Sequence, residues 1–278
     1  MKKLIYILPL AAMLFAACDK IAINEAGYYG TEAGASGEWV DGNGVVDKSQ
    51  RAYVEKFTGA KCVNCPDGDQ TLNTVAATYG DKMVAVAIDS PGSLGNPYNG
   101  FEDMRTEDGS IWAEYFGGVE QIPAYMVNRQ AMANIAMSNL ATDVAAATAQ
   151  QAKIAVAVSN TMTGDNASIK VDIEFVEKVD EALTLTLLIM EDSLVYKQLS
   201  PDGPIIDYVH NHELRDVITD VWGADIAATG AAGEKKCATF KYKVDSKWVK
   251  EHCHIIAFVS NKATKKVYNA AECELINE

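Results

Sequence analysis

The sequence is poor in basic residues: 24 lysines and arginines stand against 38 aspartates and glutamates, which gives a formal net charge of −14. Binding to nucleic acid needs a basic surface, so this charge argues against nucleic acid as a partner. The same deficit argues against attraction to anionic lipid headgroups. Beyond the first residues, no stretch is long and apolar enough to span a bilayer. Any membrane contact must therefore come from the amino-terminal end.

Motifs that would indicate a bound metal or haem are also missing. Cys62 and Cys65 form the only Cys-x-x-Cys pair, whereas a zinc site of this kind needs a second ligand pair. Pro66 follows Cys65 at the position where covalent haem attachment requires histidine. No Asp-x-Asp-x-Asp loop indicates a calcium site. We therefore expect neither a metal nor a cofactor.

All four histidines fall in two pairs, His210 with His212 and His252 with His254. On a strand, residues i and i+2 share a face, so each pair could chelate a metal ion. A turn histidine bonded to the backbone, together with surface histidines, explains the same pattern without a metal. The sequence leaves both interpretations open, and we favour the second.

The amino-terminal end has the features of an export signal. Met1–Lys3 is basic, and Leu4–Phe15 is apolar but too short for an ordinary transmembrane helix. The small residues before Cys18 resemble a bacterial lipobox, which implies that residues 1–17 are a lipoprotein signal peptide and that Cys18 is acylated. An ordinary secretory signal with an incidental cysteine is the alternative. Residues 18–48, rich in glycine, alanine, glutamate and asparagine, predict a flexible tether, so the lipid anchor would be the only membrane contact.

A location outside the cytoplasm permits disulfides. Besides Cys18 and the Cys-x-x-Cys pair, three cysteines remain: Cys237, Cys253 and Cys273. One disulfide plus one free thiol is the simplest accounting for these three. The sequence does not say which two are paired.

The stretch from Tyr53 to Cys65 predicts a redox site. Its apolar, β-branched and aromatic residues are typical of a buried strand, Thr58 and Gly59 turn the chain, and Cys62 and Cys65 fall where a helix begins. Two cysteines three residues apart at a helix start lie on one side, close enough for a disulfide. The free N–H groups of the first turn favour negative charge and lower the pKa of the first thiol. These are the properties of a dithiol–disulfide site.

The residues after this stretch predict a strand–helix–strand unit. The helix that begins at the cysteines continues to Tyr79, and the apolar run Met83–Ile88 predicts a parallel strand buried on both faces. The cysteines then lie at the carboxyl end of the first strand, where sites form in open α/β sheets. Further helices are expected over residues 101–116 and 134–151, with a strand after Pro123 between them.

A family resemblance rests on this order of elements followed by the motif Tyr115–Val127, which reads Tyr-Phe-Gly-Gly-Val-Glu-Gln-Ile-Pro-Ala-Tyr-Met-Val. Together they resemble the thioredoxin superfamily. The resemblance implies an α/β thioredoxin-like domain over residues 49–151, with a cis bond before Pro123 and this proline facing the dithiol. It also implies that Ile122 and Pro123 bind an extended substrate peptide.

The chain departs from the thioredoxin pattern near the cysteines. Lys61 stands where the family usually has tryptophan, and Val63 and Asn64 lie between the cysteines where the family usually has a proline. The buried acid that the family often carries on its first strand falls at Lys56. The neighbouring Glu55 is therefore our candidate for a proton relay.

Beyond Ala152 the pattern changes to short alternating strands. In residues 168–176 aliphatic and aromatic residues alternate with lysine, aspartate and glutamate, and Gly-Asp-Asn at 164–166 is typical of a hairpin turn. No helical pattern alternates with these strands, so they predict a second domain over residues 152–278, an all-β immunoglobulin-like sandwich. The other strands of this domain are expected at residues 153–159, 182–190, 238–244, 255–260 and 266–275.

Four segments together resemble one narrower family: the lipobox, Thr58–Pro66, Val127–Arg129 and Ile206–Arg215. This is the Gram-negative outer-membrane lipoprotein family named for a twenty-eight-kilodalton outer-membrane protein. Its members pair a thioredoxin-like domain with a carboxy-terminal β-sandwich. The resemblance implies a protein lipid-anchored to the bacterial cell envelope, at the outer membrane.

We predict thiol–disulfide exchange on envelope or surface proteins that carry disulfides, which would make the chain an oxidoreductase. Cys62, nearer the helix start, would attack as the thiolate, and Cys65 would resolve the mixed disulfide. The alternative is a non-enzymatic adhesion or binding lipoprotein with a structural disulfide. Exposure of the Cys62 sulfur discriminates the two: a redox site needs an accessible sulfur beside Pro123, whereas a structural disulfide is buried.

Overall fold

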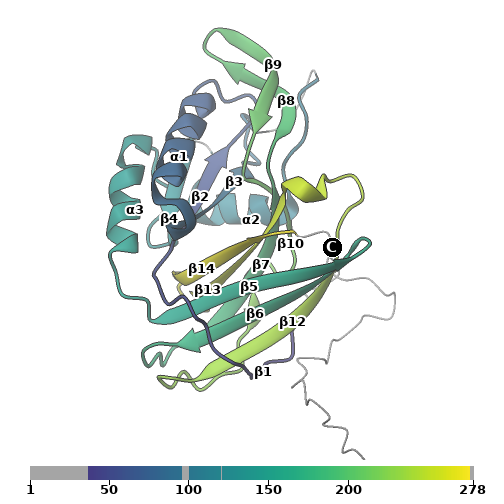
Figure 1. Ribbon diagram of the computed structural model, residues 1–278. Coiled ribbons are helices and arrows are strands. Elements are labelled where there is room, and N and C mark those ends of the chain that lie inside the picture. The colour runs from purple at the N-terminus through teal and green to yellow at the C-terminus, as the bar shows by residue number, and fades with distance from the viewer. Residues whose placement is uncertain (1–36, 96–99, 120, 276–278) are drawn as a thin grey trace, which may run out of the picture.

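The computed structural model describes residues 37–95, 100–119 and 121–275, which form mostly β-strands with a few helices (Figure 1). The predicted signal peptide over residues 1–17 and the predicted acylation site Cys18 lie outside the described residues, as does most of the tether. None of the described helices is long and apolar enough to cross a membrane.

The described elements are three α-helices, three short 3-10 helices and fourteen strands. The helices are α1 (Cys65–Tyr79), α2 (Glu107–Phe116) and α3 (Leu140–Thr148), with 3-10 helices at Gly80–Lys82, Met137–Asn139 and Lys250–His252. The strands are β1 (Val40–Asp41), β2 (Ala52–Thr58), β3 (Met83–Asp89), β4 (Ala124–Val127), β5 (Ile154–Thr163), β6 (Asn166–Phe175), β7 (Leu183–Glu191), β8 (Leu194–Ser200), β9 (Gly203–His210), β10 (Glu213–Val217), β11 (Ala224–Asp225), β12 (Lys235–Lys243), β13 (Cys253–Asn261) and β14 (Val267–Glu274).

Strand β2 is the centre of the amino-terminal part. It pairs in parallel with β3 and antiparallel with β4. All seven of its residues are buried because helices cover both faces of the sheet. Ala52 and Val54 pack with residues of α1 and α3, whereas Tyr53 and Phe57 pack with residues of α2. The alternation of side chains along the strand thus sends neighbouring residues into two different cores.

Strands from both ends of the described chain lie in one eight-stranded sheet. Its order is β14-β13-β7-β10-β3-β2-β4, and β11 pairs with β7 off this path. The join lies between β10 and β3, where Glu213 pairs in parallel with Ala87. The N–H of Ala87 also donates a hydrogen bond of 2.6 Å to the carbonyl of His212. Local periodicity does not predict this join, because it brings together residues far apart in the sequence.

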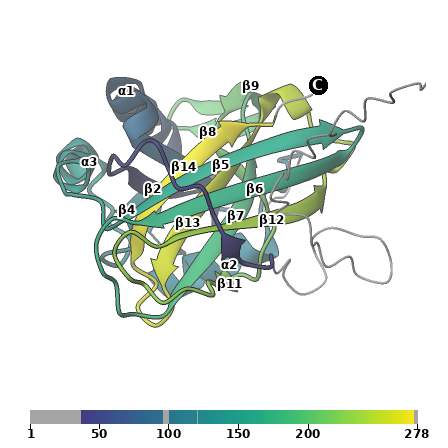
Figure 2. The same ribbon diagram turned by 60° about the horizontal axis from the view of Figure 1, so that its bottom comes forward.

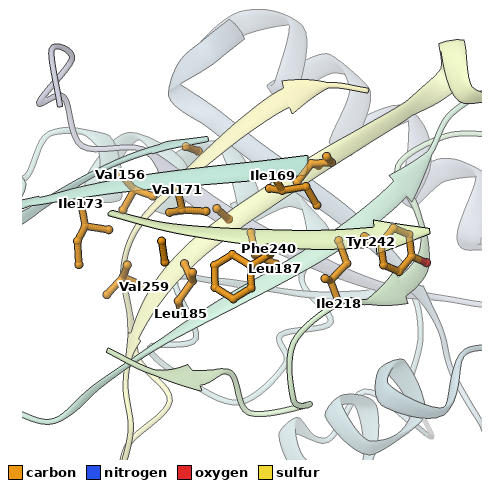
Figure 3. Close-up of a cluster of buried hydrophobic side chains, with 14 of the residues drawn as sticks. Val156, Ile169, Val171, Ile173, Leu185, Leu187, Ile218, Phe240, Tyr242 and Val259 are labelled. Carbon is orange, nitrogen blue, oxygen red and sulfur yellow. The ribbon is translucent and has the colours of Figure 1, made fainter. Parts of the chain in front are cut away.

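A second sheet, in the order β1-β12-β6-β5, packs against the β14-β13-β7 part of the first (Figure 2). Ile169, Val171 and Ile173 of β6 point into the core between the sheets, which confirms the alternation predicted there. Phe240 of β12 and Leu187 of β7 belong to the same core (Figure 3). Burying a side chain of this size stabilises the fold by about 1.5–3 kcal/mol. The two layers therefore form a β-sandwich.

All three helices begin later than the sequence predicts. α1 begins at Cys65 rather than at Cys62, which lies in the preceding turn. α2 begins after Thr106, whose hydroxyl accepts a hydrogen bond of 3.0 Å from the N–H of Gly109. Such a cap fixes the helix start, so the helix predicted over residues 101–116 is confirmed from Glu107 onward and is wrong over residues 101–106. α3 likewise begins only at Leu140, after a 3-10 helix.

The sequence pattern does not predict the hairpin of β8 and β9, which forms a two-stranded sheet of its own. β9 lacks a buried face in its first half, because residues 204–207 are all exposed. Gly203 has a φ of +110°, which glycine adopts without steric penalty. The hairpin projects beyond the main sheet near α1 (Figure 1).

Candidate dithiol site

The two cysteines form a disulfide just beyond the carboxyl end of β2. The Cα atoms of Cys62 and Cys65 are 5.3 Å apart, so the predicted closeness of this pair is confirmed. Gly59 lets the loop pass close to a neighbouring loop, since a Cβ at this position would lie 2.7 Å from the carbonyl oxygen of Leu94. The N–H of Lys61 donates to that same oxygen over 3.0 Å. The chain thus reaches Cys62 through a loop held against the residues that follow β3.

Ile122 and Pro123 lie across from the disulfide. The bond between them is cis, as predicted. The Sγ atom of Cys62 is 3.4 Å from the carbonyl oxygen of Ile122. Helix α1 approaches the proline at Gly68, where a Cβ would lie 2.7 Å from the Cβ of Pro123. Any larger residue at position 68 would push α1 away from this proline.

A groove of about 480 Å³ runs beside Pro123. The cysteines do not line it, and their exposed fractions are 2% for Cys62 and 0% for Cys65. The groove therefore reaches the proline, while the sulfurs lie beneath the surface. The lining residues are Asn64, Asp67, Gly68, Thr71, Gln121, Ile122, Pro123, Ile135 and Met137.

The β8–β9 hairpin contacts the loop that leads to the disulfide. The side-chain amide of Gln198, only 1% exposed, donates to the carbonyl of Cys62 over 3.0 Å and to that of Gly59 over 3.3 Å. The N–H of Leu199 donates to the carbonyl of Ala60 over 2.8 Å. Gln198 was not predicted as a site residue, because nothing in the local sequence pattern separates it from an exposed glutamine.

Glu55, the candidate proton relay, lies in a closed ion pair on the α2 side of β2. The Nε of Arg129 donates to both carboxylate oxygens over 3.0 Å, and its Nη2 donates to Oε1 over 2.5 Å. The hydroxyl of Tyr53 adds a hydrogen bond of 2.9 Å. The Arg129 guanidinium also lies 4.3 Å from the ring centre of Trp112 and 4.9 Å from that of Phe258. The hydrogen bonds of Glu55 therefore go to Arg129 and Tyr53, and its role as a proton relay stays a prediction.

Lys56 lies on the opposite face of β2, in a buried cluster of acids. Its ammonium contacts the carboxylate of Asp69 and interacts with the charges of Glu213 and Asp89. Burial lowers the pKa of Lys56 to about 8 and raises the pKa of Asp89 to about 6. Burial, together with the charge of Asp89, raises the pKa of Glu213 well above its usual range. The Ala60 N–H donates to Asp89, which connects the cluster to the cysteine loop.

Three of the four histidines lie near carboxylates: His210 near Glu213, and His212 and His254 near the shared carboxylate of Asp192. The Nδ1 of His254 lies 2.9 Å from a carboxylate oxygen of Glu272, and this hydrogen bond raises the pKa of the imidazole. The backbone N–H of His212 donates to Asp192 over 2.6 Å. Within the described ranges, no group of three or more histidine, cysteine, aspartate or glutamate side chains is arranged to hold a metal ion.

The disulfide that was expected among the three carboxy-terminal cysteines does not form. Cys253 and Cys273 are both free thiols, so no disulfide joins any two of Cys237, Cys253 and Cys273. The physical reason at Cys253 is its place in the sandwich core, where it is buried and where burial raises the thiol pKa to about 12. A thiol with that pKa is a poor nucleophile at neutral pH.

Comparison with known families decides the family of the chain. A family model described as "Outer membrane protein Omp28" matches residues 112–276. The chain belongs to the Omp28 family. The predicted location at the bacterial outer membrane is confirmed by this membership, since the family is described as an outer membrane protein. Attachment through a lipid anchor stays a prediction. No protein among the curated sequences matches the chain.

Solved structures resemble this Omp28-family chain at low sequence identity. HBP35 of Porphyromonas gingivalis is 17% identical over 82% of this chain and 76% of that one, with a TM-score of 0.64. A protein of Agrobacterium tumefaciens is 14% identical over 84% of this chain and 98% of that one, with a TM-score of 0.52. A domain of Omp28 from Porphyromonas gingivalis is 17% identical over 45% of this chain and 88% of that one, with a TM-score of 0.31. The first two likenesses show a shared fold and no more.

Proposed function

We propose that residues 49–151 are a thioredoxin-like domain, that residues 152–278 are an immunoglobulin-like sandwich, and that the chain carries out thiol–disulfide exchange on envelope or surface proteins. A substrate would lie in the groove beside Pro123 and react at Cys62. The observation that carries this proposal is the position of the Cys62 sulfur, which lies beneath the surface, 3.4 Å from the carbonyl oxygen of Ile122, a residue that lines the groove.

The order of the elements around the cysteines supports the proposed domain type. Strand β2, helix α1, strand β3, helix α2, strand β4 and helix α3 follow one another, with the disulfide between β2 and α1. α1 begins at Cys65, so Cys62 lies just before its first turn. The N–H of Cys65 donates to the carbonyl of Cys62 and Pro66 has no N–H, so it is the dipole of α1 that would favour a thiolate at Cys62 once the disulfide is reduced.

The proposed exchange runs in two displacements. The thiolate of Cys62 attacks one sulfur of a substrate disulfide, which forms a mixed disulfide and releases the other substrate sulfur as a thiolate that takes up a proton. The thiolate of Cys65 then attacks the Sγ of Cys62, which closes the Cys62–Cys65 bond and releases the first substrate sulfur. The substrate gains the electron pair that the dithiol loses. In the reverse direction the disulfide oxidises a substrate dithiol.

Trapping tests this proposal. In Cys65→Ser the second displacement cannot occur, so mixed disulfides between Cys62 and envelope proteins should accumulate. They should be visible on non-reducing gels and identifiable by mass spectrometry. The matched control is Cys62→Ser. It also leaves one free thiol in the pair, but it lacks the attacking sulfur and should therefore trap no substrate. Absence of mixed disulfides in Cys65→Ser, together with a Cys62 thiol pKa at its ordinary value of about 8.5, would refute the exchange activity.

A structural disulfide in an adhesion or binding lipoprotein is the second candidate. Burial of both sulfurs favours it, because Cys62 is 2% exposed and the hairpin contacts the loop before it. The reduction potential separates the two candidates. A structural disulfide should have a potential below about −300 mV and resist glutathione, whereas an exchange site should lie above that value.

A further inference from the structure

Strand β9 presents an open edge. Within the described chain β9 pairs only with β8, so no strand covers its other side. Residues 204–207 and 209 of this strand are exposed. Unpaired strand edges attract other strands, and proteins usually shorten or cover them. Pro204 has no N–H to donate, so residues 205–209 of this strand are the part open to strand addition.

Large aliphatic side chains concentrate on the same hairpin. Ile206 is 60% exposed, Val195 55%, Val209 48% and Ile205 40%. Val195 and Val209 are directly paired across the two strands, so their side chains lie on one face. Single exposed aliphatic residues are ordinary on a protein surface, but a group of them on one projecting element marks a contact surface.

Carboxylates outnumber cations around this edge, because Lys197 is the one lysine or arginine of the hairpin and its ammonium lies 5.1 Å from the ring centre of Phe101. Asp202 and Asp207 are exposed on the hairpin, and Asp67 is exposed on the neighbouring helix α1. The hairpin is held beside that helix by the hydroxyl of Tyr208, which donates to Asp69 over 2.8 Å. Carboxylates on both elements favour a partner that carries basic residues.

We infer that the edge of β9 binds an extended, apolar segment of a partner protein that carries basic residues. The partner would add a strand to the β8–β9 sheet. Backbone hydrogen bonds to β9 would supply affinity, and contacts with Ile206 and Val209 would supply selectivity. The inference concerns a surface that contains neither cysteine, so it does not depend on the proposed exchange activity.

A second copy of the chain fits this edge poorly. Each copy carries a formal charge of −14. Pairing β9 with β9 of another copy would also bring the Asp207 carboxylates of both copies into one short segment. Like charges at close range oppose such pairing.

Binding of a defined peptide to the full chain tests the inference. The probe is a short, end-blocked peptide of alternating lysine and valine, measured by fluorescence anisotropy and by hydrogen exchange of the β9 amides. It should bind and slow exchange in β9. The matching peptide of glutamate and valine should bind at least about tenfold more weakly, the ratio that corresponds to about 1.4 kcal/mol.

Variants locate the site. Ile206→Lys should weaken binding of the lysine–valine peptide about tenfold or more, and Asp207→Asn should reduce the preference for lysine over glutamate. Val249→Lys is the matched control, since Val249 is 46% exposed and lies outside the hairpin, and it should bind as the wild type does. Equal binding of both peptides, unchanged binding in Ile206→Lys, or a dimer of the free chain with protected β9 amides would each overturn the inference.

Discussion

Glu55 and Lys56 are neighbours on β2, yet they lie in two very different buried environments. On the α2 face, Glu55 and Arg129 form a closed pair in which both carboxylate oxygens are bonded and aromatic rings flank the guanidinium. On the opposite face, Lys56 lies among Asp69, Asp89 and Glu213. The first environment balances one charge against one charge, and the second holds more acids than bases.

The difference shows how a buried charge can be tolerated in two ways. A closed pair keeps both charges and bonds them fully, because an unpaired charge in the core is costly. A crowded cluster keeps its charge low by holding protons, and the raised pKa values of Asp89 and Glu213 reflect this. The two clusters should therefore respond differently to the loss of their cation and to pH.

Removal of the cation should give the largest effect. Arg129→Met leaves the buried Glu55 carboxylate without its partner and should lower the free energy of unfolding by about 3–5 kcal/mol. Lys56→Met should lower it by only about 2 kcal/mol, because Asp89 and Glu213 can bind protons in exchange. Urea denaturation at neutral pH measures both values.

Arg105→Met is the control for this pair of variants. Arg105 bonds Asp103 at a partly exposed site, so its loss should change the free energy of unfolding by less than about 1 kcal/mol. Equal losses in Arg129→Met and Lys56→Met would show that proton binding does not compensate in the Lys56 cluster.

The pH dependence of stability should come next in size. Asp89 has a pKa of about 6 in the folded chain, above its unfolded value of about 3.9. Between these two pKa values the folded chain binds more protons than the unfolded chain does. The protonated Asp89 therefore contributes stability that is present below pH ~4 and is lost as the pH rises through ~6. Asp89→Asn should remove this pH-dependent loss. The free energy of unfolding of the variant should therefore exceed that of the wild type by on the order of 1–2 kcal/mol between pH ~4 and ~7. Urea denaturation across this range should give diverging curves.

The exposed residue Asp180 provides the control for that experiment, since its carboxylate is 74% exposed beside Lys178. Asp180→Asn should follow the wild-type curve at every pH. Parallel curves for Asp89→Asn and the wild type would mean that Asp89 titrates alike in the folded and unfolded chain.

Loss of a single hydroxyl should give the smallest effect. Tyr53→Phe removes one hydrogen bond to Glu55 and should lower the free energy of unfolding by about 1 kcal/mol, because the carboxylate keeps Arg129. Tyr208→Phe removes the matching hydroxyl from Asp69 at a site with partial exposure, and its effect should be smaller. Thermal denaturation of both variants compares them, and a larger loss in Tyr208→Phe would contradict this ranking.

The sequence predicted most elements whose cause is local. The alternation in residues 168–176 matches β6, and the apolar run Met83–Ile88 matches β3, because burial patterns follow strand geometry directly. Helix starts were less well predicted, since the cap at Thr106 looks like many other threonines in a loop. The closeness of Cys62 and Cys65 followed from their spacing, whereas the cis bond before Pro123 was predicted only through the family resemblance.

Contacts between distant segments could not be predicted in this way. Gln198 bonds the Cys62 carbonyl from a hairpin that the pattern does not reveal. Glu213 joins the Lys56 cluster only because β10 pairs with β3. Strand alternation alone places Glu55 and Lys56 on opposite faces, but it does not say that one meets Arg129 and the other meets acids.

The pairing of β10 with β3 also determines the order in which this sheet can form during synthesis and export. β3 pairs with β2 on one side, and on its other side it meets β10 at Glu213. A chain that leaves the ribosome and the export machinery from its amino terminus therefore exposes one edge of β3, an apolar and fully buried strand in the final fold, until residue 213 arrives. Such an edge is prone to pair with other chains. The sheet around β3 is therefore completed only after residue 213 has been made.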